Sequence, residues 1–529
     1  MGKGTLTVRA QTASDALPLG NVKIILRDNA GRILYNLVTD ENGEVPPVIL
    51  ETVSREMSMI PDYTGTPYAE YDLTAEANGF NSLHISDVQI FDGETAVQPL
   101  RLLPLLVGQA RPLAHEITIG SHAVADPAAR VQEGAMAART RILPQVIIPD
   151  PITVHLGAPS AAAANVRVSF ADYVKNVASG EIYPTWPKAA LQANIYAIIT
   201  FALNRVFTQW YRSRGYNFDI TSSTAYDQAF KYGRTIYKSI SDTADEILNR
   251  YVRRAGQLAP YFTSFCNGST VTCAGLSQWG TVSLANKGKN ALQILRTYYP
   301  KDLETAQAEI TSGAVDAYPG TALRQGSTGR NVELIQSFLA RIRKNYPGIP
   351  AITDSPGKFG NSTKTAVKKF QSVFNLTADG IVGHATWNKL VNIYVAVAKL
   401  ASLDSEGSAL GIGTVPPASE LRQGSGGLDV VILQYLLDFI GEFYPTIQAP
   451  AQDGQFGAST ARAVSEFQAM MGLPATGIVN PATWNALYTA YWSIRNDVPL
   501  PVPGSGPGVP YTVQLGDTLW RLAQRFGTT

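Results

Sequence analysis

The sequence is poor in the residues that cross-link small domains or hold metals. Its 529 residues include two cysteines, Cys266 and Cys273, and five histidines. So few cysteines exclude a disulfide-rich scaffold, and the spacing of the pair does not match the usual half-site of structural zinc. The pair fits either a local disulfide or two buried thiols. We therefore expect no bound metal and no cofactor.

Charged residues and long apolar runs are scarce as well. Charged residues make up 16% of the chain and hydrophobic residues 45%. The best candidate for a membrane span, residues 189–207, is interrupted by Gln192, Asn194 and Asn204, so we expect no spanning helix. The first residues lack the basic and apolar stretches of a Sec signal peptide. The apolar content instead predicts about three to five folded domains.

The small net charge hides an uneven distribution. Residues 1–150 carry 11 Lys and Arg against 18 Asp and Glu, a net charge of −7, whereas the rest of the chain carries +8. An acidic N-terminal part before a basic body suggests an anionic target that the N-terminal part masks. Chance variation between domains is the alternative.

The N-terminal part alternates apolar and polar residues as β-strands do. Residues 1–103 contain strand-like runs, such as 5–10 and 33–38, separated by turn residues, and they predict a small β-sandwich. The pattern resembles the carboxypeptidase-regulatory or transthyretin-like modules, which are accessory. Residues 104–150 lack this periodicity and include arginines among small residues, at Arg130, Arg139 and Arg141. We interpret 104–150 as a linker with an activation cleavage site.

The central part mixes strand and helix patterns. Residues 152–156 and 166–170 read as strands, and residues 187–210 have the apolar periodicity of a helix. Residues 225–254 read as largely helical. We therefore expect residues 151–310 to form a mixed α+β catalytic domain.

An internal repeat follows. Leu323-Arg324-Gln325-Gly326-Ser327 returns 98 residues later, and Phe370-Gln371 returns 97 residues later as Phe467-Gln468. A near-constant offset indicates duplication. It predicts two small three-helix bundles, at residues 320–395 and 418–492, each ending in a short helix with a tryptophan. A Pro/Gly-rich linker at 498–509 comes next. The fold class is thus a multidomain α+β protein.

The C-terminal half resembles modules that bind bacterial cell walls. The second repeat matches the peptidoglycan-binding three-helix domain at Asp453-Gly454-Gln455-Phe456-Gly457 and Thr483-Trp484, and the first repeat matches at Phe359-Gly360 and Thr386-Trp387. Residues 510–529 resemble the first strand and helix of a lysin motif, a partial match carried by Gly516-Asp517-Thr518-Leu519-Trp520. These resemblances imply peptidoglycan as a partner, and no nucleic acid.

The central part resembles an enzyme family. Residues 172–193 are similar to the catalytic stretch of stage II sporulation protein D, a lytic transglycosylase, and 219–230 and 276–300 match its later blocks. With the flanking modules, the chain resembles the clostridial spore cortex-lytic enzymes. This resemblance implies a zymogen that subtilisin-like germination proteases activate to degrade spore cortex. It implies a place in the cortex or coat region, after synthesis in the mother cell.

The resemblance implies that Glu181 is the catalytic acid. Cleaving a glycosidic bond requires a proton on the leaving oxygen, and the apolar residues around Glu181 would favour its protonated form. A lytic transglycosylase then uses the same carboxylate as a base on the muramyl 6-hydroxyl, which closes a 1,6-anhydro ring without water. A hydrolase needs a second carboxylate, for which Asp172, Asp219 and Asp227 are available. The alternative for Glu181 is an exposed capping residue.

Five more residues are candidates to line the substrate groove, with packing or local hydrogen bonding as the alternative: Tyr183, Gln228, Ser277, Gln278 and Trp279. Two other functions stay open. The chain could be a non-catalytic peptidoglycan-binding spore coat protein, or a muramidase or glucosaminidase that hydrolyses the same glycan.

Overall fold

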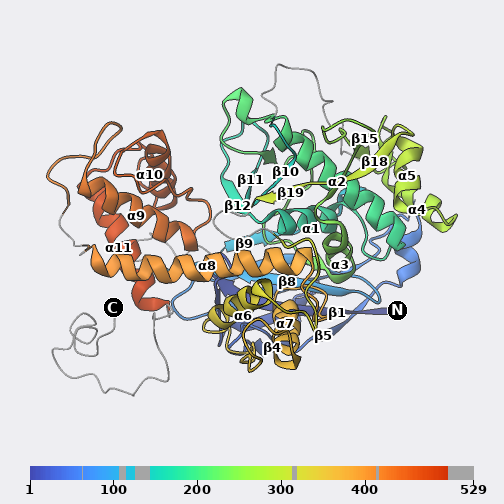
Figure 1. Ribbon diagram of the computed structural model, residues 1–529, viewed down its shortest axis with the longest axis horizontal. Helices are drawn as coiled ribbons and strands as arrows, with labels where there is room; N and C mark the ends of the chain where they lie inside the picture. Colours follow the sequence, from blue (N-terminus) through green and yellow to red (C-terminus); the bar gives the residue numbers. More distant parts are fainter. Residues whose placement is uncertain are drawn as a thin grey trace.

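The computed structural model describes residues 1–61, 63–106, 115–125, 143–311, 318–410, 412 and 416–498. An N-terminal β head (residues 1–125), an α+β body (143–311) and two helical repeats follow one another along the chain (Figure 1). This arrangement confirms the predicted multidomain α+β fold class. Three predicted features lie outside the described residues: the linker at 498–509 except for its first residue, the lysin motif, and the three arginines near the expected cleavage site.

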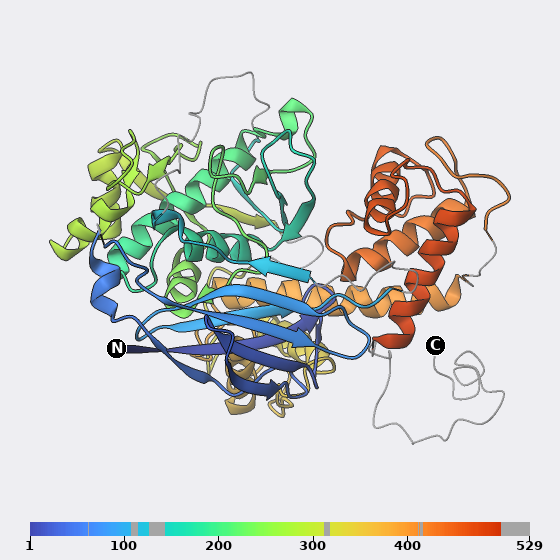
Figure 2. The same cartoon turned by 180° about the vertical axis from the view of Figure 1, so that it is seen from behind.

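The head is built from two five-stranded sheets that face each other (Figure 2). Alternate residues of its strands are buried, as period-two patterning requires, and Leu6, Val8 and Ala10 of the first strand lie in the core. One sheet has the order β14-β8-β1-β2, with β5 also paired to β1, and the other has the order β4-β3-β6-β7-β9. The head's elements are β1 (Gly2–Thr12), β2 (Leu17–Pro18), β3 (Lys23–Asp28), β4 (Ile33–Val38), β5 (Val48–Thr52), η1 (Arg55–Met59), β6 (Ala69–Glu76), β7 (Leu83–Ile90), β8 (Thr95–Arg101), β9 (His115–Thr118) and η2 (Ala123–Ala125).

The body is organised around one buried helix, α2 (Lys188–Phe207). This helix is apolar on all sides and most of its residues are buried, as expected for a helix surrounded by other elements. Its other helices are α1 (Phe170–Glu181), η3 (Arg212–Arg214), α3 (Lys238–Ile247), α4 (Gln278–Asn286) and α5 (Ala291–Tyr298). Its strands are β10 (Ile147–Pro149), β11 (Ile152–His155), β12 (Asn165–Val168), β13 (Ile220–Thr221), β14 (Ile236–Tyr237), β15 (Arg250–Arg254), β16 (Phe265–Cys266), β17 (Leu276–Ser277), β18 (Leu303–Gln307) and β19 (Glu309–Thr311).

Two sequence expectations for these parts are wrong. Residues 225–254 are helical only over α3, because β14 pairs with β8 of the head and β15 pairs with β18. The supposed linker 104–150 contributes β9, which pairs in parallel with β7, and β10, which pairs with β19. Both errors have the same cause: these strands are short, and their partners lie far away in the sequence.

The two repeats have the same internal design. The first contains α6 (Arg330–Ile342), α7 (Asn361–Val373) and α8 (His384–Ala409), and the second contains α9 (Leu428–Phe443), α10 (Ala458–Met470) and α11 (Pro481–Asp497). Gln371 donates to Thr386 Oγ1 at 3.0 Å, and its counterpart Gln468 donates to Thr483 Oγ1 at the same distance. The duplicated Phe-Gln motif is therefore structural.

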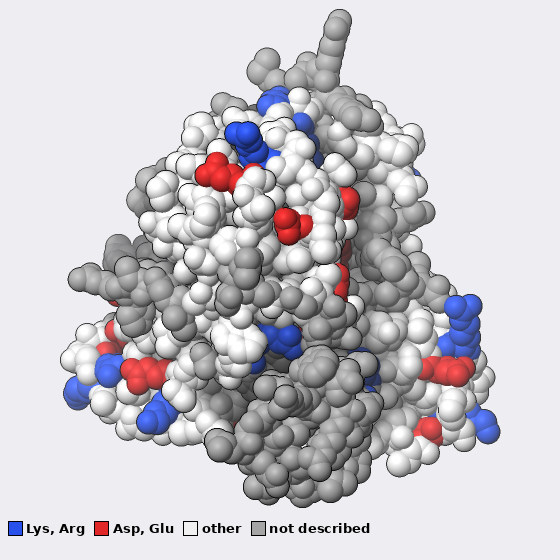
Figure 3. Space-filling model, turned by 90° about the vertical axis from the view of Figure 1, so that its left-hand side faces the viewer, with Lys and Arg blue, Asp and Glu red and all other residues white. Residues whose placement is uncertain are grey.

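The tryptophan helix of the first repeat is not short, contrary to expectation. It forms α8, which runs for 26 residues and joins the second repeat to the rest of the molecule (Figure 1). No helix among the described residues is long and apolar enough to cross a membrane. On the side of the molecule seen in Figure 3, basic and acidic side chains are few and interspersed, so the surplus of basic residues forms no single patch on the described part of that face.

Candidate active site

Glu181 is the last residue of α1 and is buried. Ser169 caps the start of this helix by accepting a hydrogen bond from the Asp172 N–H, and Ile182 ends it in an extended conformation. The Glu181 side chain is only 1% exposed. Its Oε1 accepts from the Ala229 N–H at 3.0 Å, and its Oε2 accepts from Gln278 Nε2 at 3.2 Å. The alternative interpretation of Glu181, an exposed capping residue, is therefore wrong.

These contacts bring three separate sequence blocks to one carboxyl group. Glu181 lies in the block 172–193, Ala229 in 219–230 and Gln278 in 276–300. The Gln278 side chain has its Oε1 buried without a partner among the described residues. If this amide were rotated by 180°, its Oε1 would accept a hydrogen bond from the O–H of a protonated Glu181. The same side chain therefore fits either protonation state of the acid.

Gly180 allows an arginine to approach the end of α1. A Cβ at this position would lie 2.6 Å from Arg234 Nη1 and 3.2 Å from the Ala229 carbonyl oxygen. Arg234 donates to Ser179 O at 3.0 Å and to Ile119 O of the head at 3.2 Å. Burial lowers the pKa of Arg234, but the carbonyl groups at the helix C-terminus favour a cation there.

An aromatic cluster lies beside the acid. The Tyr183 ring is 6.0 Å from Trp279, and Trp279 is 4.8 Å from Trp186, measured between ring centroids. All three are buried, and burial raises the pKa of the Tyr183 phenol above its usual value. Aromatic faces of this kind suit the apolar faces of sugar rings, although here they also pack against one another.

The remaining groove candidates hold local structure. Gln228 donates to Ile198 O at 3.2 Å and accepts from Tyr173 OH at 2.9 Å, so both ends of its amide are used inside the protein. Ser277 caps α4 by accepting from the Gly280 N–H at 2.9 Å. Of the five candidates, Gln278 donates a hydrogen bond to Glu181, while Tyr183 and Trp279 lie in the aromatic cluster.

The three acids considered as a second carboxylate beside Glu181 have other partners. Asp227 accepts from Arg205 Nε at 2.8 Å and from Tyr211 OH at 2.6 Å, in a fully buried ion pair. Asp219 pairs with Arg212 at 2.6 Å, at the surface. Asp172 pairs with Lys389 at 3.2 Å. Because Asp172 precedes Glu181 by nine residues of helix, it lies about 13 Å away along the axis and roughly on the opposite face.

The head covers this site. The ring of His122 lies 5.2 Å from Tyr183, and Phe91 lies 5.6 Å from it, while Ser58 O accepts from Trp186 Nε1 at 3.1 Å. These three segments of the head, with Ile119 on Arg234, account for the burial of the aromatic cluster. Only the opposite charges of the two parts indicate this cover at the level of sequence.

In β16, which pairs with β17, Cys266 forms a disulfide with Cys273 at an S–S distance of 2.20 Å. The intervening Asn267 donates to Val124 O of the head at 3.4 Å. Among the described residues, no group of three or more His, Cys, Asp or Glu side chains could hold a metal ion.

Comparison with known families matches three parts of the chain. The peptidoglycan binding domain model matches residues 328–390 and 426–487, the stage II sporulation protein model matches 160–250, and the LysM domain model matches 511–529. The range that matches the stage II sporulation protein model, 160–250, contains Glu181, Gln228 and Arg234.

Curated relatives cover shorter stretches. A zinc D-Ala-D-Ala carboxypeptidase of Streptomyces albus G is 42% identical over 92 residues, which are 17% of this chain and 34% of that protein. The N-acetylmuramoyl-L-alanine amidase CwlL of Bacillus licheniformis is 34% identical over 173 residues, which are 32% and 46% of the two chains. The aligned part thus spans less than half the length of either relative.

Among solved structures, the SleB N-terminal domain is 32% identical, with a TM-score of 0.13, and the match covers 15% of this chain and 99% of that one. With its peptidoglycan binding repeats, its stage II sporulation protein segment and its LysM segment, the chain has a domain architecture like that of the spore cortex-lytic enzymes.

Proposed function

We propose that this protein is a peptidoglycan lytic transglycosylase, made as a zymogen, that cleaves the glycan strands of spore cortex during germination. The observation that carries the proposal is the convergence on Glu181. The buried carboxyl group of Glu181 accepts hydrogen bonds from the main-chain N–H of Ala229 and the side-chain amide of Gln278. The three residues come from the three blocks that resemble the catalytic domain. A pre-positioned acid in an apolar, aromatic setting suits general acid catalysis.

In this mechanism Glu181 acts twice. It first gives its proton to the glycosidic oxygen, so that the bond to the muramyl anomeric carbon breaks and the leaving sugar departs with a hydroxyl group. The carboxylate then takes the proton of the muramyl 6-hydroxyl group, while the oxygen of that hydroxyl group bonds to the anomeric carbon. The proton balance is zero, no water is consumed, and the product has a 1,6-anhydro-muramyl end.

The environment of the neighbouring acids favours this single-carboxylate route. A hydrolase needs a second carboxyl group about 5 to 9.5 Å from the first, free to act on water or sugar. Asp172 is too far away and on the wrong helix face, and Asp227 is bound by Arg205, Tyr211 and Thr221. Both therefore suit structural roles better than catalytic ones.

Burial of the site supports the zymogen. Glu181 is 1% exposed in the intact chain, and Phe91, His122 and Ser58 cover the aromatic cluster beside it. A glycan strand reaches this carboxyl group only after the head moves. Cleavage by a subtilisin-like protease within residues 104–150, followed by loss of the head, would provide that step in the spore.

Product analysis tests the proposal. The chain is cut at a protease site introduced at residues 130–135, the head is removed, and purified cortex is digested with the parent and with Glu181→Gln. The parent should release anhydro-muramyl fragments and the Gln variant none. A matched control, Glu246→Gln, removes an exposed carboxylate that pairs with Lys188 and should leave the products unchanged. Wild-type product release by Glu181→Gln would refute the assignment.

The same digest separates the alternatives. A muramidase or glucosaminidase adds one water to each cleaved bond and leaves a reducing end. An amidase, the activity named for the Bacillus licheniformis relative, would leave the glycan whole and release stem peptides with a new amino terminus. A non-catalytic coat protein would release nothing.

A further inference from the structure

The two repeats present the same tyrosine corner after their first helix. Tyr346 follows α6 and Tyr444 follows α9, 98 residues later, and each is followed by a proline. In both corners the main chain turns identically: Ile349 N–H donates to Tyr346 O at 3.0 Å, and Ile447 N–H donates to Tyr444 O at 2.9 Å. The two corners are therefore structural equivalents.

Both corners are docked on the head through their hydroxyl groups. Tyr346 OH donates to the main-chain oxygen of Asp15 at 2.6 Å, and Tyr444 OH donates to the main-chain oxygen of Pro104. The two tyrosines are 0% and 3% exposed. Beside the first corner, Asn345 Nδ2 donates to Ala16 O at 3.0 Å. In each case a repeat donates a hydrogen bond to a carbonyl group of the head.

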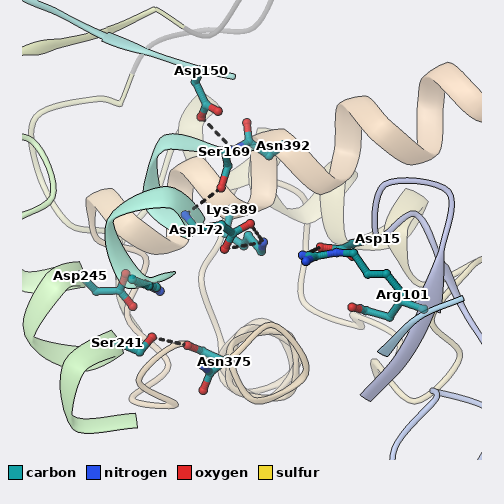
Figure 4. A network of polar contacts seen from close by, with 12 residues as sticks. Asp15, Arg101, Asp150, Ser169, Asp172, Ser241, Asp245, Asn375, Lys389 and Asn392 are labelled. Atoms are coloured by element: carbon teal, nitrogen blue, oxygen red, sulfur yellow. Dashed lines mark hydrogen bonds and ion pairs between the residues drawn. The ribbon is translucent and has the colours of Figure 1, made fainter. Parts of the chain in front are cut away.

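The loop of the head between the two corners is strained. Ala13, Ser14 and Asp15, in the turn between β1 and β2, have φ values of 52°, 51° and 65°. Three consecutive non-glycine residues in the left-handed region cost free energy, and such strain persists where contacts hold it. Arg101 supports the turn by pairing with Asp15 at 2.9 Å (Figure 4). Ser14 Oγ donates to Glu442 O of the second repeat at 3.2 Å.

The first repeat has a separate attachment to the body (Figure 4). Lys389 of α8 pairs with Asp172 at 3.2 Å, and Asn392 Nδ2 donates to Asp150 Oδ2 at 2.9 Å. Burial opposes the charge of Asp172, but Lys389, Arg101 of the head and Lys175 together outweigh it and hold the pKa of Asp172 well below its usual range. The Lys389–Asp172 pair and the Asn392–Asp150 hydrogen bond both join α8 to the body, so they would hold the repeat in place when the head leaves.

Docking of both repeats through one equivalent corner is not required by their fold. Their cores are held by internal networks, such as Gln371 with Thr386, whereas the tyrosine hydroxyls point out of the repeats to a partner. A duplicated module that uses the same surface twice is expected to use it for recognition. The head meets that surface with main-chain carbonyl groups, which peptidoglycan also offers in its acetamido groups and stem-peptide bonds.

We propose that the corners at Tyr346 and Tyr444 bind carbonyl groups of peptidoglycan, and that the head occupies both corners in the uncut chain. The head then blocks wall binding as well as the active site. Its removal frees the acid and the two repeats together, so the enzyme engages the wall only after activation. This inference rests on the proposed function insofar as it requires a removable head.

Binding is tested separately from catalysis. Full-length protein carrying Glu181→Gln and a protease site at residues 130–135 is mixed with purified peptidoglycan, before cutting and after removal of the cut head by size-exclusion chromatography. The bound fraction is measured by sedimentation. Removal of the head should raise the affinity at least tenfold. Residues 511–529, which match the LysM model, are present in both samples and contribute equally.

The tyrosines themselves are tested in the head-free protein. Tyr346→Phe and Tyr444→Phe remove only the hydroxyls, and each should weaken peptidoglycan binding by about threefold to tenfold, the usual effect of one hydrogen bond. The matched pair Tyr394→Phe and Tyr488→Phe should bind as the parent does. Thermal unfolding verifies that all four variants fold.

Two results would overturn the inference. One is equal affinity with and without the head, and the other is unchanged binding by the Tyr346→Phe, Tyr444→Phe double variant. Failure of the proposed activity would look different, because Glu181→Gln would still release fragments or the cut parent would release none. The sedimented fraction would decide the binding comparison in either case.

Discussion

Acidification should loosen the head from the cut protein, because His122 is buried without charge at the interface. This residue is 0% exposed, and its ring lies among Tyr68, Phe91, Tyr183 and Tyr237. Burial, aided by the nearby positive charge of Arg234, holds the pKa of His122 well below its ordinary value of 6.5. A released head would expose the ring to water and restore a pKa of roughly 6.5.

The sign and size of the effect follow from this difference in pKa. The docked state binds fewer protons than the released state, so docking is strongest above pH 6.5 and weakens as the pH falls below it. One unit below that value, the dissociation constant should rise about tenfold, which corresponds to about 1.4 kcal/mol. The rise continues until the pH reaches the pKa of the docked histidine.

The assay uses protein cut at an introduced site at residues 130–135, with the head retained. The dissociation constant of the head is measured between pH 5 and pH 7.5, in parallel with His122→Phe, which keeps an aromatic ring that cannot ionise. Their ratio removes the contribution of carboxyl groups such as Glu94, whose pKa burial raises. A pH dependence that is identical in the two proteins would refute the reasoning.

Three more predictions concern the site. Gly180→Ala should destabilise the protein by about 1 to 3 kcal/mol and lower activity, because its Cβ meets Arg234 at 2.6 Å; denaturant unfolding checks this against Gly457→Ala, where the space is open. Gln278→Leu should lower kcat by roughly tenfold to a hundredfold with little change in KM, because it removes a contact that positions Glu181. Steady-state kinetics measure this effect, and a shifted pH profile in Gln278→Glu separates it from misfolding. Asp227→Asn should cost about 3 kcal/mol in the free energy of unfolding by leaving a buried arginine unpaired, and unchanged stability would contradict its structural role.

Local patterns predicted the repeats well. The constant offset identified the duplication, and each helix of the repeats has an apolar stripe that its own sequence supplies. The length of α8 was not predicted, because its apolar pattern continues through Val397, Leu400 and Leu403, all buried, beyond residue 395, where the first bundle was expected to end. Helix length here depends on packing between the repeats, which the sequence does not display.

Long-range partners limited the prediction elsewhere. β14 is two residues long and exists because β8 of the head lies beside it, so its own sequence has no strand signal. In the candidate site, motif context singled out Glu181 and Gln278, which are in contact, but the third partner is the main-chain N–H of Ala229, which no side chain marks. The cover over the site depends on contacts between segments about a hundred residues apart, which no local pattern encodes.

The most direct test of the account is mass spectrometry of cortex fragments released by the head-free protein and by its Glu181→Gln variant. The account predicts anhydro-muramyl ends from the parent, with no added water, and no fragments from the variant. Reducing ends, free peptides with an intact glycan, or equal release by both proteins would contradict it.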